Sequence, residues 1–465
     1  MRAQLLIAIL LVAIVHGASA HAQTPITSAT ISHQMPLEVV DGSGNNLPVN
    51  VTQLPLDFFD DYSWRMFVSL NWPAKEGVRG VPDETKSVGG LGPCVWETWK
   101  TGFEIVPKSI SAADAPTPWD SFDAKTPCSE LDVPASGSGK RRILAAWKAF
   151  GDFHQAGFGT FDDTNPLVCQ NKTHVRYEVR VNQAEYVHIV ARKLYLRSTI
   201  AALTFPERFP NNAVEVKAAW REMGDEVPES EAKTFYTIKA LVHDPATNTS
   251  TEKRMALVGF HIVHKTPLRP QWIWSSFEHI RNVPTTNMPG AMEKFSFNDP
   301  TKPQATDSPP AALSPANPPM PPLTPTQVVR ELPLHPAAPG NIGTAATNQR
   351  YQLALANTVW ANYMLVATQW PTKTSSPMAN PPDNIDGNPF PPMFGSTTSV
   401  SNTTLETYRQ SNSCMSCHDM ARMANLDFVF FIDFHALNDT SFSGIKPRTL
   451  DLLRGAIQKG KETRR

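Results

Sequence analysis

Two cysteines and one histidine near the C-terminal end of the chain have the spacing of a covalent cofactor site. The segment reads Cys414-Met415-Ser416-Cys417-His418. Because residues three apart lie on one side of a helical turn, both thiols can reach one edge of a porphyrin and form thioether bonds with its vinyl groups. The adjacent imidazole can then bind the iron as proximal ligand. The pattern C-x-x-C-H therefore predicts one covalently attached c-type haem.

The residues around this pattern favour a helix that runs through it. Ser411, Asn412 and Ser413 are good N-cap residues, and the stretch from Met415 to Leu426 contains neither Gly nor Pro. The motif resembles that of the c-type cytochromes. Two other uses of paired cysteines compete with this interpretation. A thioredoxin-type redox pair lacks its βαβ setting, and a zinc site lacks a second C-x-x-C or an H-x-x-x-H partner.

The N-terminal residues predict export, which agrees with haem attachment outside the bacterial cytoplasm. Arg2 precedes an apolar run from Leu5 to Val15, and the small residues Gly17-Ala18-Ser19-Ala20 follow. This order is typical of a signal peptide, residues 1–20, with cleavage after Ala20 or after Ala22. No later apolar run reaches the roughly 20 residues that a membrane span requires. We therefore expect a periplasmic protein without a membrane span.

The sixth iron ligand is open from the sequence alone. Met420 and Met423 lie on the same short predicted helix as His418 and cannot reach the opposite face of the ring. His435 is the histidine downstream of the motif, and a turn near Asn425 would bring it around. Met393, on a Pro-rich loop, is the second candidate. An iron without a sixth ligand, or with one from the rest of the chain, is the third possibility.

Three cysteines lie outside the motif, at positions 94, 128 and 169. In an oxidising compartment a pair of these is expected to be bridged. Cys94 and Cys128 each follow a Pro in a loop-like stretch, so we predict a disulfide between them. Cys169 would then be free or buried, because no flanking base or helix start favours a reactive thiol.

The middle of the chain has the pattern of an antiparallel sheet. Apolar and polar residues alternate over His174–Val181 and Val214–Trp220, which predicts half-buried strands. A third strand is expected over Phe235–Val242. The continuous apolar run Met255–His264 predicts a central strand covered on both faces, and Gln271–Phe277 is expected to return beside it.

Helices and Pro-rich segments complete this α+β organisation. A helix is expected over Asp57–Trp72 with Asp60 or Asp61 as its cap, and another after Asn182 with Glu185 in a capping box. Val95–Trp99 suits a short strand or a helical turn. The predicted divisions are 21–297, a β-rich antiparallel domain with a few helices; 298–340, a Pro-rich linker or surface strap; and 341–465, the small helical haem-bearing region.

Three histidines of the β-rich region invite a metal-site interpretation. On a strand, residues three apart point to opposite faces, so His261 and His264 cannot bind one ion. Packing is the simpler explanation for both and for His279, although one of the three could still reach the haem. Glu278 next to His279 resembles an acid–base pair only in composition. Trp272 and Trp274 are predicted to be core residues, although a Trp beside a haem would assist electron transfer.

A second segment extends the resemblance beyond the motif. The segment HIVHKTPLRPQWIWSSFEHIRNVP, residues 261–284, together with one haem motif near the C-terminus, resembles a group of secreted bacterial cytochrome c-family proteins of uncharacterised role. The resemblance implies the haem and the compartment but no activity.

These features support one main function hypothesis and two alternatives. The first is a periplasmic monohaem c-type cytochrome that transfers electrons to a partner protein. An enzyme is the second, in which the β-rich domain binds a substrate and the haem takes its electrons; the chain length supports it. The third is a haem-binding sensor without redox function. The formal net charge of −1, without a basic stripe, argues against a nucleic-acid partner.

Overall fold

A computed structural model describes the protein at the following residues: 23–47, 56–106, 116–121, 143–144, 167–204, 207–244, 249–284, 294–302, 324–370, 402–411, 413, 414, 418, 421, 425–432 and 436. Its α-helices and 3-10 helices are α1 (Leu56–Leu70), η1 (Val95–Thr98), α2 (Gly102–Ile105), α4 (Gln183–Ala191), α5 (Arg197–Ala201), α6 (Glu229–Ala232), α7 (Thr344–Ala354) and η3 (Val359–Asn362). Its strands are β1 (Lys100–Thr101), β2 (Ile143–Leu144), β3 (Arg176–Val181), β4 (Val214–Glu222), β5 (Thr237–Asp244), β6 (Thr249–Thr266), β7 (Arg269–His279) and β8 (Tyr363–Gln369).

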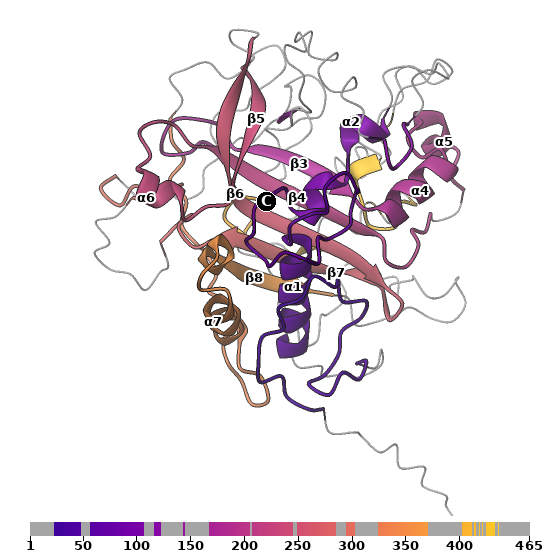
Figure 1. Ribbon diagram of the computed structural model, residues 1–465, viewed down its shortest axis with the longest axis horizontal. Helices are drawn as coiled ribbons and strands as arrows, with labels where there is room; N and C mark the ends of the chain where they lie inside the picture. The colour runs from indigo at the N-terminus through magenta and orange to yellow at the C-terminus, as the bar shows by residue number, and fades with distance from the viewer. Residues whose placement is uncertain are drawn as a thin grey trace, which may run out of the picture.

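Within the described residues these strands form one eight-stranded sheet around β6 (Figure 1). The first part of β6 pairs with β5, and its later part lies between β4 and β7. β3 and β1 extend the sheet beyond β4, and β8 extends it beyond β7. Every pairing is antiparallel except the short one between β2 and β5. The expected α+β class with a large antiparallel sheet is therefore confirmed.

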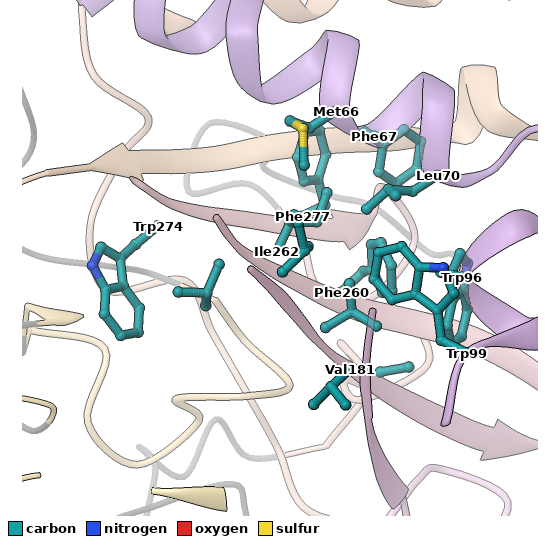
Figure 2. Packing of buried hydrophobic residues seen from close by; sticks show 14 of the residues in the cluster. Met66, Phe67, Leu70, Trp96, Trp99, Val181, Phe260, Ile262, Trp274 and Phe277 are labelled. Carbon is teal, nitrogen blue, oxygen red and sulfur yellow. The ribbon is translucent and has the colours of Figure 1, made fainter. Parts of the chain in front are cut away.

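Helix α1 covers one face of this sheet and supplies much of the core. Phe67 of α1 stacks on Phe277 of β7, with ring centroids 4.4 Å apart, and meets Phe260 of β6 edge-on. Figure 2 shows Met66, Phe67 and Leu70 lying over these strands. Because apolar residues recur at helical spacing on α1, one side of the helix reaches the apolar face of the sheet. We call this the α1 face.

The predicted cap of α1 is wrong, because Asp60 and Asp61 lie within the helix and are buried. The Asp60 carboxylate accepts hydrogen bonds from the hydroxyls of Thr344 and Thr368, at 2.7 and 2.8 Å. Ser63 continues this polar network toward the sheet. An Asp near a helix start is commonly a cap, but here the helix begins earlier, at Leu56, and tertiary partners satisfy the carboxylate.

The C-terminal part of the chain covers the opposite face, which we call the C-terminal face. Gly259 leaves room there for Thr404, since a Cβ at Gly259 would lie 2.0 Å from the Thr404 hydroxyl oxygen. Asn402 donates to the Ser276 hydroxyl at 2.9 Å, and the Tyr177 hydroxyl donates to the Thr404 carbonyl at 2.8 Å. The residues after 402 are therefore held against the strands by polar contacts.

Other predicted elements are confirmed with shifted limits or corrected. Val95–Thr98 is a 3-10 helix, so the helical alternative holds there. Asn182 caps α4 by accepting from the Glu185 amide at 3.1 Å, but the Glu185 side chain turns inward and forms no capping box. Strand β8 lies within the region 341–465, so this region shares the sheet with β7.

Candidate haem site

His418 lies on the C-terminal face, beside two aromatic rings. Its ring centroid is 4.3 Å from that of Trp274 of β7 and 4.9 Å from that of Phe430. Its Nδ1 lies 2.7 Å from the Phe428 carbonyl oxygen. Because a carbonyl can only accept, Nδ1 carries the proton, and Nε2 is the nitrogen with a lone pair for a metal.

A helix end makes this hydrogen bond possible. Cys414, His418 and Ala421 have helical backbone. The Leu426 amide donates to the Ala421 carbonyl at 2.9 Å, and Asn425 has a φ of 66°. This pairing is the Schellman arrangement, in which a left-handed residue ends the helix. The predicted helix through Leu426 therefore ends before Asn425, and the chain turns back toward the imidazole.

The turn after the helix is anchored in the protein interior. The Asp427 carboxylate pairs with Lys265 at 2.7 Å and accepts the Phe209 amide at 2.7 Å. The Trp272 indole donates to the Asp427 carbonyl at 3.0 Å. The carboxylate and ammonium are almost fully buried, so removing either would leave an uncompensated charge. These bonds fix the position of the neighbouring Phe428 carbonyl.

Cys414 is positioned by strand β8. Its amide donates to the Gln369 side-chain oxygen at 2.9 Å, and its side chain packs on Val366 and Ala367. Gln369 lies directly opposite Trp274 in the pairing of β8 with β7. The register of two strands therefore brings the first cysteine and the histidine of the motif onto neighbouring positions of one face.

The electrostatic surroundings keep His418 neutral. Removal from water lowers the pKa of His418 to about 3. The Phe428 hydrogen bond opposes this effect, while Lys217 and His261, which face the same side of the sheet, lower the pKa further. A metal-binding imidazole must be unprotonated, so this environment suits a ligand.

The arrangement fits a haem at each described position. A histidine ligand ordinarily donates its other ring nitrogen to a carbonyl or carboxylate, which fixes its tautomer and orientation. The Phe428 carbonyl does so here. Trp274 and Phe430 provide apolar contact beside the imidazole, and the partly buried Cys414 has helical backbone, as His418 does. The described residues are therefore of the types that would hold and cover a c-type haem.

Several predicted site residues lie outside the described part of the chain: Cys417, His435, Met393 and Cys128. The second thioether, the sixth ligand and the disulfide therefore stay predictions. Cys94 is buried near Tyr236. Cys169 is buried as expected, and burial raises the pKa of its thiol to about 12, which makes it a poor nucleophile.

The three histidines of the sheet have separate roles. His264 bonds to the Tyr62 hydroxyl on the α1 face, whereas His261 lies 3.3 Å from the Glu406 carboxylate on the C-terminal face. His279 bonds to the Thr234 carbonyl at 3.0 Å. No three His, Cys, Asp or Glu side chains gather as a metal site in the described residues. Each of these histidines therefore has a polar neighbour of its own in the described residues.

Sequence reasoning missed the residues that position the motif. Gln369 and Lys217 are polar strand residues, and neither carries a signal in the sequence beyond the alternation of its strand. The role of Phe428 belongs to its backbone carbonyl, which every residue has. Trp274 was expected in the core, and it is buried in contact with His418.

Comparisons with protein-family models, with curated proteins and with solved structures found no match to this chain. Among the helices of the described residues, none has the length and apolar character to cross a membrane.

Proposed function

We propose that the protein is a periplasmic monohaem c-type cytochrome that transfers electrons to a partner protein. The observation that supports this most is the environment of His418. Its Nδ1 donates to a backbone carbonyl, and aromatic rings from β7 and from the following segment lie beside it. In this proposal Cys414 and Cys417 hold the haem covalently, and His418 is the proximal ligand.

The residues around the motif would orient and tune the cofactor. A bound c-type haem supplies an iron that accepts and donates one electron at a time. Its potential depends on the axial ligands, their hydrogen bonds and burial. Phe428 sets the orientation and basicity of the imidazole, and the positive charge of Lys217 faces the site. A nearby cation disfavours the additional positive charge of the oxidised iron, so we expect Lys217 to raise the potential.

Covalent attachment is the direct test. We expect full-length protein from a cytochrome-maturing host to carry one haem by mass spectrometry, and the haem to stay bound in acidic organic solvent. Replacing Cys414 and Cys417 together by Ser should abolish attachment. Cys169→Ser, outside the motif, is the matched control and should keep its haem. A wild-type chain without haem would contradict the proposal.

Optical spectra would separate the electron carrier from the alternatives. A six-coordinate, low-spin haem is expected for electron transfer, because no iron position is then open for a substrate. An iron that reacts with peroxide would favour an enzyme, and one that binds gases a sensor. Comparing His435→Ala with Met393→Ala in the same measurement would identify the sixth ligand, since only loss of that ligand changes the spin state.

A further inference from the structure

Two buried carboxylates, those of Glu185 and Glu215, have oxygens without a hydrogen-bond partner in the described residues. Glu185 of α4 is 0% exposed, and neither of its carboxylate oxygens is hydrogen-bonded to any described residue. Glu215 of β4 is 9% exposed, and one of its oxygens is equally without a partner. Helix α4 packs on β4 (Figure 1), and the two carboxylates interact electrostatically. Two adjacent buried carboxylates cannot both be charged without a large cost.

The register of the sheet places this pair near His418. Glu215 lies opposite Val263 of β6, and Val263 lies opposite Trp274 of β7, so all three face one side. Trp274 contacts the His418 ring. Neighbouring strands are about 4.8 Å apart, so two strand spacings separate Glu215 from Trp274. Lys217 acts on both Glu215 and His418, so one charge is close to both groups.

We propose that Glu185 and Glu215 together carry one proton, and that the pair takes up a second proton from solvent when the haem site accepts an electron. This inference rests on the proposed haem function. The electron comes from a one-electron donor, and the proton forms an O–H bond on one carboxylate, so no other bond changes. The protein would therefore couple its redox state to pH.

The charged groups around the pair support this assignment. Burial raises the pKa of Glu185 well above its usual value, and Glu215 and Asp427 raise it further. Burial likewise raises the pKa of Glu215 to about 7, against the lowering effect of Lys217.

The other ionisable groups nearby have partners of their own. Asp427 is paired with Lys265 of β6, His188 of α4 with Glu207, and Arg197 of α5 with the Ala436 carbonyl. His261 of β6 faces Glu406. The pair is therefore the buried acid at this site that can change its charge near neutral pH.

The direction of the effect follows from charge. A negative pair stabilises the oxidised iron, which carries one more positive charge than the reduced iron. Deprotonation therefore lowers the reduction potential as the pH rises. We expect the midpoint potential to fall across a window around pH 7 and to level off on both sides. A tenfold ratio of proton affinities between the two redox states corresponds to 59 mV.

Potentiometric titration of haem-loaded protein between pH 5 and pH 9, with dithionite and ferricyanide, tests this. The variant carrying both Glu185→Gln and Glu215→Gln should have a midpoint near the wild-type low-pH value and a flatter pH dependence. Glu252→Gln, which removes a half-exposed carboxylate from β6, is the control and should match wild type. Haem content, measured first by mass, separates the two proposals.

Three outcomes separate the proposed function from the role of the Glu185 and Glu215 pair. A chain without haem overturns both the proposed function and the pair's role. A haem-loaded double variant with the wild-type pH dependence overturns the pair alone. If the double variant does not fold, the redox-difference infrared spectrum decides: wild type should show the carbonyl stretch of a protonated carboxyl group, and Glu215→Gln should change it. An identical band in both proteins would reject the inference.

Discussion

The Phe428 backbone carbonyl orients His418, so this hydrogen bond does not depend on the type of side chain at position 428. A substitution at Phe428 removes a ring from the core but leaves its carbonyl oxygen in the turn. Trp274 acts differently, because its contact with the imidazole belongs to its side chain. Orientation of the ligand and apolar cover of the site are therefore provided by separate residues.

Asp60 predicts a pH-dependent stability. Burial raises its pKa from 3.8 to about 7, so the folded state binds the proton more tightly than the unfolded chain. The free energy of unfolding should therefore fall as the pH rises between these values. Since one pKa unit corresponds to about 1.4 kcal/mol, this loss is roughly 4 kcal/mol. Asp60→Asn should remove this share of the pH dependence, whereas the share of Glu215, whose pKa is also raised to about 7, should remain. Urea unfolding of both proteins at pH 4.5 and pH 7.5 measures the difference.

The control for this measurement is Asp225→Asn, which changes an exposed loop carboxylate. It should keep the pH dependence of the wild type. If Asp60→Asn keeps it as well, another group carries the effect, and the assignment to Asp60 is wrong. Asn can still accept one of the two threonine hydrogen bonds, so we expect the variant to fold.

The helix that carries the motif depends on how it ends. Its last turn leads into residues with positive φ, at 66° for Asn425, 23° for Asp427 and 68° for Phe428. The amide of Glu207 also donates to the Asn425 carbonyl at 2.8 Å. This tight turn brings the Phe428 carbonyl back to the His418 imidazole. A helix that continued past this point would carry Phe428 away from His418.

Asn425→Ala should therefore weaken the site, whereas Asn425→Gly should be tolerated. A left-handed backbone costs an Ala about 1–2 kcal/mol, whereas Gly adopts it freely. We expect Ala to lower the free energy of unfolding by about 1 kcal/mol and Gly to change it by less. Denaturant unfolding of both haem-loaded variants measures this. Equal stability of the two would show that the turn does not depend on the backbone conformation of residue 425.

The C-terminal residues and the sheet share one hydrophobic core. Phe428, Val429 and Ile432 belong to the same buried cluster as Phe67 of α1 and Phe277 of β7. A segment so short cannot bury this apolar run alone, and these residues are buried in one cluster with residues of the sheet and of α1. In Figure 1 the C-terminal residues, in yellow, lie beside α4.

A fragment of residues 341–465 should therefore fail to fold on its own. It contains β8 but not β7, the partner of β8 in the described sheet, and it lacks Trp274. Exported with a signal peptide, it should show no cooperative thermal unfolding, whereas the full chain should unfold in one transition. A soluble, monomeric fragment with the spectrum of the full protein would show instead that the haem-bearing region is an independent module.

Local sequence predicted most of the elements and the haem attachment that we propose. The C-x-x-C-H spacing predicts that attachment within five residues, because thiols three apart share one side of a helical turn. Alternation over β3 and β4 predicted strands, and the apolar run of β6 predicted a central one. The same rules separated His261 from His264. These inferences depend only on the backbone period, which neighbouring residues reveal.

Tertiary structure alone decided what surrounds the motif. Alternation shows that Glu215 and Trp274 each face one side of a strand, but which strands pair, and in what register, depends on contacts between residues far apart in the chain. For the same reason Asp60 resembled a helix cap until its partners Thr344 and Thr368 were known. The interaction of Glu185 with Glu215, and the position of Glu215 two strands from Trp274, are likewise properties of packing between distant segments.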